Sequence, residues 1–322
     1  MIISGEAVVV KNAGSHFMLS ELPVWAPFPA VLKGRIRLKG GDSTNPVAVG
    51  DRVCYEAEVP DGQGVESVCV ERPAVISAVR DRKNYVIRRS TNLSRQSHVI
   101  AANIDMAYIV VSLYFPEIKL PFLDRLLVTC EVYGVSVTIV LNKVDLYAEE
   151  ASEYMEHFRG IYTGAGYRVM ETSVRTGQGI DELRADCRGR VCLFSGESGV
   201  GKSSLIKAID PSLNPKTGQI STAHLQGRHT TSLYEMYRIA SGGYIIDTPG
   251  LRGFGLVDLG KEEIALYFPE MLRVSQGCRF TPCTHTHEPG CAVKQAVEDG
   301  EISAERYSSY LGMLEEDNKF RQ

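Results

Sequence analysis

The chain has 322 residues, of which 44% are hydrophobic and 23% charged, with a formal net charge of −4. This length predicts two or three domains, and the composition is that of an ordinary globular protein. The small negative charge excludes a chain that binds polyanions over its whole surface. No apolar run approaches the ~20 residues that span a bilayer, and the start, "MIISGEAVVV", has no export signal, so we expect a cytoplasmic protein.

Residues 1–72 are predicted to form short strands that are separated by Gly, Pro and Asp turns. No helical period interrupts them, and four or five such strands in this length indicate a small β-barrel. An OB-fold and an SH3-like barrel fit the pattern equally well. The expected strands are "GEAVVVKN", "HFMLSEL", "AVLKGRIRLK", "DRVCYEAEV" and "ESVCVERP".

Two basic clusters lie in and just after this barrel. In the first, a cation stands at every second position, which places the cations on one face of a strand. Each cluster alone fits a solvated strand face or a charged linker as well as a binding surface. Together, ahead of the domain described next, they favour a nucleic-acid backbone as partner. They consist of Lys33, Arg35, Arg37 and Lys39, and of Arg80, Arg82, Lys83, Arg88, Arg89 and Arg95.

From residue 73 to about 255, buried apolar strands alternate with helices, which predicts an α/β domain with a mostly parallel sheet. Beyond residue 256 the chain becomes helical and acidic around a cysteine–histidine cluster, and we expect a third domain at 256–322. The expected strands are "MAYIVVSL", "SVTIVLNKVDL", "YRVMETSV", "GRVCLFSGESG" and "GGYIIDTPG", and the expected helices are "LPFLDRLLVTCEVYG", 148–165 and "KSSLIKAI".

The motif "NKVD" follows one of these strands and indicates recognition of guanine. An ionised Asp145 only accepts hydrogen bonds, and guanine presents adjacent N1–H and 2-amino donors to it. Adenine lacks the 2-amino group, so the same carboxylate would be imperfectly paired with it. We expect Asn142 to organise the loop and Lys143 to lie along the ring. Ser173, in "ETSVRTGQGIDEL", marks a loop whose backbone N–H would meet the guanine O6.

The stretch "GESGVGKS" matches the P-loop pattern GxxxxGK[ST] between a predicted strand and a predicted helix, a context that disfavours a mere glycine-rich turn. Glycines let backbone N–H groups turn inward on phosphates at the start of a helix. Lys202 would contact the β- and γ-phosphates, and the Ser203 hydroxyl would bind Mg²⁺. The expected phosphate-binding residues are Gly196, Glu197, Ser198, Gly199, Val200, Gly201, Lys202, Ser203 and Ser204.

The tetrapeptide "DTPG" follows a strand about 45 residues after the P-loop, where Asp247 would reach Mg²⁺ through water and Gly250 would sense the γ-phosphate. The same tetrapeptide is also good turn chemistry. The base-reading motif thus precedes the phosphate-binding motif in the chain. Loops at the carboxyl ends of parallel strands share one edge of the sheet, whatever their order in the chain. We therefore expect one guanine-nucleotide site in a circularly permuted domain.

The last cluster contains Cys278, Cys283, His285 and Cys291, and its spacing predicts a closed tetrahedral Zn²⁺ shell with a structural role. His287 is the alternative nitrogen ligand, and reduced thiols without metal or a disulfide are further alternatives. Zinc binding should be coupled to folding of so short a segment. The other cysteines are expected to be reduced thiols of the core: Cys54, Cys69, Cys130, Cys187 and Cys192.

Over nearly its whole length the chain resembles the RsgA (YjeQ) family of circularly permuted, ribosome-associated GTPases. The resemblance rests on the barrel, "NKVD", "GESGVGKSSL", "GRHTT", "DTPG" and the cysteine–histidine cluster, in that order. It implies hydrolysis of GTP to GDP and phosphate with Mg²⁺, stimulation by the small ribosomal subunit, and a role in late maturation of that subunit. The implied partners are the subunit, its rRNA and assembly factors. Nothing in the sequence demands more than a monomer.

The segment "GRHTT" occupies the place of a first switch loop, where Thr230 or Thr231 would complete the Mg²⁺ shell. Leu251 stands where Ras-like enzymes have a water-orienting Gln, and a leucine cannot orient water by hydrogen bonding. The resemblance nominates His229 for that catalytic role; a histidine of a surface loop is the alternative. The missing Gln also leaves a non-catalytic GTP-binding rRNA scaffold as an alternative function. In a P-loop kinase, the second alternative, "NKVD" and "DTPG" would have no role.

Overall fold

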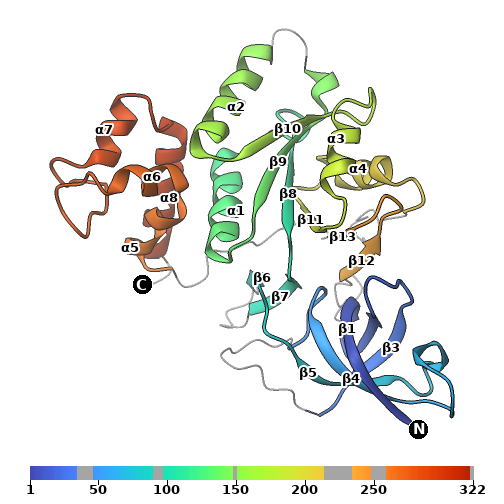
Figure 1. The fold of residues 1–322 in the computed structure, drawn as a ribbon. Helices are drawn as coiled ribbons and strands as arrows, with labels where there is room; N and C mark the ends of the chain where they lie inside the picture. The colour runs from blue at the N-terminus through green and yellow to red at the C-terminus, as the bar shows by residue number, and fades with distance from the viewer. Residues whose placement is uncertain (35–45, 90–96, 148–150, 214–233, 248–258, 320–322) are drawn as a thin grey trace, which may run out of the picture.

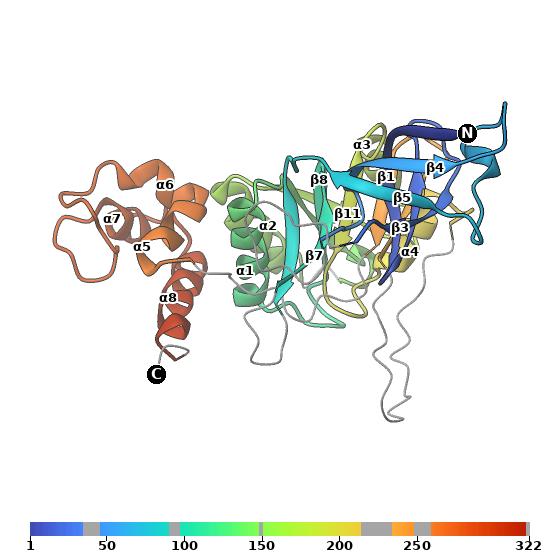
Figure 2. The same ribbon diagram turned by 90° about the horizontal axis from the view of Figure 1, so that it is seen from below.

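The computed structural model describes residues 1–34, 46–89, 97–147, 151–213, 234–247 and 259–319. An N-terminal β-barrel, an α/β domain and a helical domain follow one another along the chain. Figures 1 and 2 show the α/β domain in the middle, with the barrel on one side and the helical domain on the other.

Five strands close the barrel in the order β1-β2-β3-β5-β4, because β4 pairs back onto β1. β3 and β5 are parallel, whereas the other neighbours are antiparallel. The strand expected in "ESVCVERP" is wrong: Val65–Ser67 is a 3₁₀ turn, and the closing strand begins beyond the expected boundary at residue 72. The run "AVISAV" supplies that strand because it buries Ala74 and Ile76 on one face. The strands are β1 (Ile2–Ala13), β2 (His16–Ser20), β3 (Phe28–Leu32), β4 (Arg52–Glu58) and β5 (Ala74–Val79).

The α/β domain contains all five strands that its sequence predicts, parallel and in the order β10-β9-β8-β11-β13. β12 (Tyr234–Arg238), which was not predicted, pairs antiparallel with β13 and extends the sheet. The hairpin of β6 (Tyr85–Arg89) and β7 (Ser97–Ala102) was not predicted either. The parallel strands are β8 (Met106–Val111), β9 (Val137–Asn142), β10 (Arg168–Thr172), β11 (Val191–Ser195) and β13 (Tyr244–Asp247).

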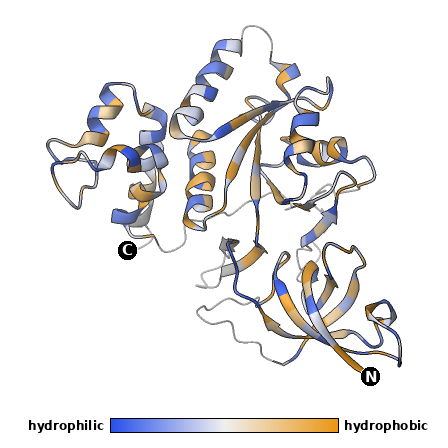
Figure 3. Cartoon of the chain, viewed as in Figure 1, coloured by the Kyte–Doolittle hydropathy of each residue, from blue (hydrophilic) through white to orange (hydrophobic). Residues whose placement is uncertain are grey.

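Helices cover both faces of this sheet, which is why its strands are continuous apolar runs (Figure 3). Side chains of α1 and α2 share one apolar cluster with the sheet, and those of α3 and α4 share the other. The short 3₁₀ helix η2 (Val144–Leu146) follows β9. The helices are α1 (Leu120–Val132), α2 (Ser152–Ala165), α3 (Ile180–Asp186) and α4 (Lys202–Ile209), so the three predicted ones are confirmed.

The barrel and the α/β domain share one continuous sheet, because β1 is long enough to pair with β12 beyond the barrel. Lys11 lies opposite Glu235, and Lys11 Nζ is 2.9 Å from Glu235 Oε1. Trp25 of the β2–β3 loop packs its ring on Tyr244 of β13, with 5.7 Å between the ring centroids. This junction is therefore built mainly from backbone hydrogen bonds and apolar contacts.

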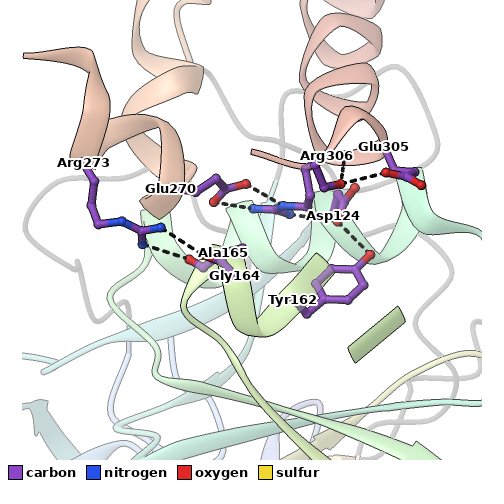
Figure 4. Close-up of polar contacts among 9 residues, drawn as sticks. Asp124, Tyr162, Gly164, Ala165, Glu270, Arg273, Glu305 and Arg306 are labelled. Carbon is purple, nitrogen blue, oxygen red and sulfur yellow. Dashed lines mark hydrogen bonds and ion pairs between the residues drawn. The ribbon is translucent and has the colours of Figure 1, made fainter. Parts of the chain in front are cut away.

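The helical domain packs against α1 and α2 on the other side of the molecule. Its core contains Phe268, Met271 and Tyr310 and includes Val128 of α1. Within the interface, Arg306 is fully buried between carboxylates of both domains, as described below (Figure 4). The elements are α5 (Lys261–Ile264), η4 (Ala265–Tyr267), α6 (Pro269–Ser275), α7 (Ala292–Glu298) and α8 (Ala304–Lys319).

Candidate functional site

The P-loop connects the end of β11 to the start of α4, as the sequence predicts. Gly196, Gly199 and Gly201 all have positive φ, at 145°, 88° and 101°. A Cβ on Gly196 would lie 2.1 Å from the carbonyl oxygen of Val110, and one on Gly201 would lie 2.4 Å from Asn142 Nδ2. Conformation therefore favours glycine at all three positions, and close packing requires it at Gly196 and Gly201. The loop opens onto a helix N-terminus that suits an anion.

Lys202 and Asp247 are the charged side chains at the base of this loop. Lys202 is buried, and its Nζ donates to the carbonyl oxygens of Gly196 at 2.8 Å and Glu197 at 2.7 Å. Burial lowers the pKa of Lys202, and the carboxylates of Asp247 and Glu197 oppose this effect. Burial raises the pKa of Asp247 to about 6, with Lys202 opposing. Charged phosphate oxygens are stronger acceptors than carbonyls, so this ammonium is poised to exchange its loop contacts for a polyphosphate.

Two side chains tie the loop after β9 directly to the P-loop. Asn142 is 2% exposed, and its Nδ2 donates to the carbonyl oxygen of Val200 at 2.8 Å, across 58 positions of sequence. Lys143 has a φ of 65°, and its Nζ donates to the carbonyl oxygens of Gly199 and Phe115, both at 2.6 Å. The "NKVD" segment and the P-loop therefore lie in contact, although "NKVD" comes first in the chain.

Asp145 lies on η2, beside the loop that follows β10. Its side chain is 11% exposed, and its Oδ1 accepts a hydrogen bond from Ser173 Oγ at 2.6 Å. Arg175 approaches Oδ2 at 3.9 Å. A carboxylate has lone pairs for several donors, so Asp145 can accept two adjacent N–H groups from a base at this edge.

The other residues of the predicted site differ in how exposed they are and in whether the structure describes them. Ser203 is half-buried in the first turn of α4, Val200 is buried, and Ser198 and Ser204 are exposed. The remaining expected residues lie outside the described residues: His229, Thr230, Thr231 and Gly250.

Sequence reasoning missed three residues that contact this site. Thr172 Oγ1 donates to Asn142 Oδ1 at 3.0 Å, Arg175 lies beside Asp145, and the buried hydroxyl of Tyr147 bonds to the Asn142 carbonyl oxygen at 2.7 Å. Thr172 and Arg175 lie one and two positions from the predicted Ser173 in "ETSVR", so their nearness in sequence could have placed them at the site. Tyr147 carried no signal, since only the turn of η2 directs its side chain back toward β9.

Cys278, Cys283, His285 and Cys291 converge in the helical domain, with their ligand atoms all within 4.8 Å of one another. Cys278 Sγ is 3.9 Å from Cys291 Sγ, and His285 Nδ1 is 3.4 Å from Cys291 Sγ. Zn–S bonds of ~2.3 Å in a tetrahedron require S···S separations of about 3.8 Å, so the donor set fits a zinc ion. Burial lowers the pKa of His285, which favours the neutral, ligating imidazole. His287 is exposed and outside the cluster.

The basic clusters are only partly described, and their described members are paired with acidic groups. Arg82 forms a two-pronged pair with the buried Asp51, with both N···O distances at 2.7 Å. Arg80 pairs with Glu6, Lys33 with Glu56 and Lys83 with Asp105. Arg35, Arg37, Lys39 and Arg95 lie outside the described residues, and of Arg88 and Arg89 only the backbone is described. The described cations therefore add little free positive charge to this side of the molecule.

Among the described residues, the helices are too short or too polar to traverse a bilayer.

Comparisons with known proteins show the family of the chain. A family model described as RsgA GTPase matches residues 79–257. The small ribosomal subunit biogenesis GTPase RsgA 2 of Bacteroides thetaiotaomicron is 48% identical over 318 residues, which are 98% of this chain and 99% of that protein. The crystal structure of YjeQ from Thermotoga maritima is similar, with a TM-score of 0.76 and 32% identity over 98% of each chain. That of YloQ, a circularly permuted GTPase, has a TM-score of 0.71 and 27% identity over 99% of this chain and 96% of that one. The family predicted from the motifs is confirmed, and the chain belongs to the RsgA family of GTPases.

Proposed function

We propose that the chain binds GTP with Mg²⁺ between the P-loop and the 142–145 loop and hydrolyses it to GDP and phosphate. The contact of Asn142 with the carbonyl of Val200 is the observation that carries this proposal, because it joins the two motifs into one pocket edge. Asp145 reads the guanine, and Lys202 binds the β- and γ-phosphates. The nearby Lys202 opposes the rise in the pKa of Asp247 and so favours its ionised form, which a magnesium site needs.

Substitution of the guanine-reading carboxylate tests this assignment. Asp145→Asn replaces an acceptor by a donor, so the preference for GTP over ATP should fall, and binding of XTP, whose base carries a 2-oxo group, should improve. Asp181→Asn is the matched control, since that carboxylate is 93% exposed on α3. If Asp145→Asn and Asp181→Asn had the same affinity for each of the three nucleotides, GTP, ATP and XTP, the proposed site would be contradicted.

Magnesium would be held by Ser203, by Thr230 or Thr231, and by Asp247 through a water. For the hydrolytic water we propose His229 as the orienting group, because Leu251 cannot serve. His229→Ala should slow phosphate release while GTP affinity changes little. A comparable loss of GTP binding would remove His229 from this role.

The relatives' name, small ribosomal subunit biogenesis GTPase, supports a role of this chain in biogenesis of that subunit. We propose that it acts in late maturation of the subunit, in the cytoplasm. We propose that the barrel is an OB-fold that contacts rRNA, which its closed strand order with parallel β3 and β5 supports. The barrel would extend to residue 79, the GTPase domain from about 80 to 255, and the zinc domain over 256–322. Phosphate release measured with and without purified small subunits tests the role. GTP turnover that small subunits leave unchanged would contradict it.

We propose that the cysteine–histidine cluster holds one structural Zn²⁺, because all four positions of a tetrahedron have protein ligands. Metal analysis should find one zinc per chain. His285→Ala should lower this content, whereas His287→Ala should retain it.

A further inference from the structure

We propose that Tyr147 is a positioning residue for guanine recognition, which holds the 142–145 loop in its base-reading form. This inference rests on the proposed function, since it deepens the role given to Asp145. Tyr147 directly follows η2, is 9% exposed, and belongs to the apolar cluster that includes side chains of α1 and α2. The ring packs edge-on against Tyr114, with 5.8 Å between the centroids.

The hydroxyl of Tyr147 makes two short hydrogen bonds to backbone groups at the ends of two neighbouring strands. It accepts from the amide of Leu113, just after β8, at 2.7 Å, and donates to the carbonyl oxygen of Asn142, at the end of β9, at 2.7 Å. The second bond reaches back five residues and closes the segment 142–147 into a ring. Asp145 lies inside that ring, so the same hydroxyl anchors both the loop and its neighbouring strand end.

The carbonyl held by Tyr147 belongs to the peptide that leads into Lys143. Lys143 has a φ of 65°, a left-handed conformation that is unfavourable for a residue with a Cβ and persists where its surroundings enforce it. Tyr147 fixes the carbonyl before this residue, while the Lys143 ammonium is fixed by the carbonyls of Gly199 and Phe115. The direction of the chain into η2, and with it the position of the Asp145 carboxylate, therefore depends on the tyrosine hydroxyl.

Removal of the hydroxyl would leave two buried backbone groups without their partner. The carbonyl of Asn142 and the amide of Leu113 would each lose a hydrogen bond. Water could not replace the hydroxyl, because this position is buried. Burial raises the pKa of Tyr147 to about 12, so the phenol remains protonated and able to donate throughout the neutral range. The 142–145 loop would relax from the geometry in which the Asp145 carboxylate accepts from two adjacent N–H donors of guanine.

Tyr147→Phe tests this proposal because it keeps the ring and removes only the oxygen. GDP and IDP are titrated by calorimetry, since hypoxanthine keeps N1–H and lacks the 2-amino group. We expect the affinity for GDP to fall about tenfold and the preference for GDP over IDP to fall with it. The kcat at saturating GTP should stay within about twofold, because the P-loop is unchanged.

Tyr108→Phe is the matched control, because it also deletes one hydroxyl of a buried tyrosine in the sheet. Tyr108 donates to Asp186 Oδ2 at 2.7 Å in the opposite apolar cluster, away from the base-reading loop. It should lower thermal stability without changing the GDP-to-IDP ratio. An unchanged ratio in Tyr147→Phe, or an equal change in both variants, would overturn the proposal. A wild type without preference for GDP over IDP would instead refute the guanine site itself.

Discussion

The barrel and the helical domain are attached to the central α/β domain by different physical means. The barrel junction is a shared sheet edge, where β1 pairs with β12 and Trp25 packs on Tyr244. The helical-domain junction is built around a buried guanidinium: Arg306 donates to Glu270 Oε1 at 2.7 Å and to Asp124 Oδ1 at 2.8 Å (Figure 4).

This difference determines how each junction responds to change. At a junction of backbone pairing and apolar packing, the stabilising free energy decreases gradually as contacts are removed, and it does not depend on pH. A buried ion network responds abruptly, because the loss of one partner leaves an uncompensated charge in an apolar surrounding. Asp124, on α1, also accepts from Tyr162 of α2 at 3.0 Å, so the network connects four helices of both domains.

Removal of the proposed zinc ion should produce the largest effect and should affect only one junction. The hydroxyls of Tyr307 and Tyr310, on α8, donate to the carbonyls of His285 and Thr284, so the loop of the cysteine–histidine cluster holds the helix that carries Arg306. Structural zinc contributes ~10 kcal/mol or more in small domains, so chelation should abolish amide-exchange protection over residues 259–319. The fluorescence of Trp25, the single tryptophan, should stay constant; its simultaneous change would show that the junctions are not independent.

Arg306→Met should be the most damaging single substitution at the charged junction. It leaves the buried carboxylates of Asp124 and Glu270 without their cation, which costs about 3–5 kcal/mol. The urea transition of the helical domain, followed by amide exchange, measures this loss. Arg273→Met is the matched control: within the described residues, that guanidinium donates to the backbone carbonyls of Gly164 and Ala165 across the same junction and not to a carboxylate. We expect it to cost about 1 kcal/mol, and equal costs would refute the special role of the buried network.

Trp25→Ala should weaken the barrel junction by about 2 kcal/mol, because it exposes the ring of Tyr244 and removes a half-buried aromatic. Urea unfolding followed by circular dichroism measures the change. Trp25→Phe keeps a ring at this place and should recover most of the loss. A cost that varied strongly with pH would contradict an apolar junction.

Asp124→Asn should have the smallest effect, about 1 kcal/mol near neutral pH, because Glu270 still pairs with Arg306. Burial raises the pKa of Asp124, with Arg306, Tyr162 and Ser309 opposing. The folded protein therefore binds more protons than the unfolded chain between the two pKa values, and wild-type stability falls as the pH rises through that interval.

Asp124→Asn does not lose stability in this way as the pH rises. The difference in the free energy of unfolding between the wild type and the variant should therefore shrink with rising pH. Urea unfolding of both proteins between about pH 5 and about pH 8 measures the trend. A deficit that grows with pH would mean that Asp124 is stabilised in its ionised form.

The sequence predicted the elements whose signals are local. Apolar runs located the five parallel strands, and because parallel strands end at one edge, the contact of "NKVD" with the P-loop followed from their positions. The cysteine–histidine spacing located the cluster around Cys291. Each of these inferences needed only a short window of residues and a general rule of topology.

The remaining features depend on partners that are distant in sequence. Arg306, in "SAERYSSYL", has the appearance of an exposed helical residue, and its burial follows from carboxylates at positions 124 and 270. Arg82 belongs to a basic cluster that fits a solvated face or a binding surface, and its pair with the buried Asp51 depends on a residue 31 positions away. β12 alternates polar and apolar residues around the buried Met236 and is too short to stand out from a loop.

The shared sheet edge also has a consequence for synthesis of the chain. The five described strands of the barrel end at Val79, so the barrel can close early on the ribosome, whereas the partner of Lys11 on β12 is 224 residues away. Until that partner emerges, the far end of β1 presents an open strand edge, which in nascent proteins invites wrong pairing between chains. A lysine on this edge discourages such pairing through repulsion between copies and later forms the ion pair with Glu235.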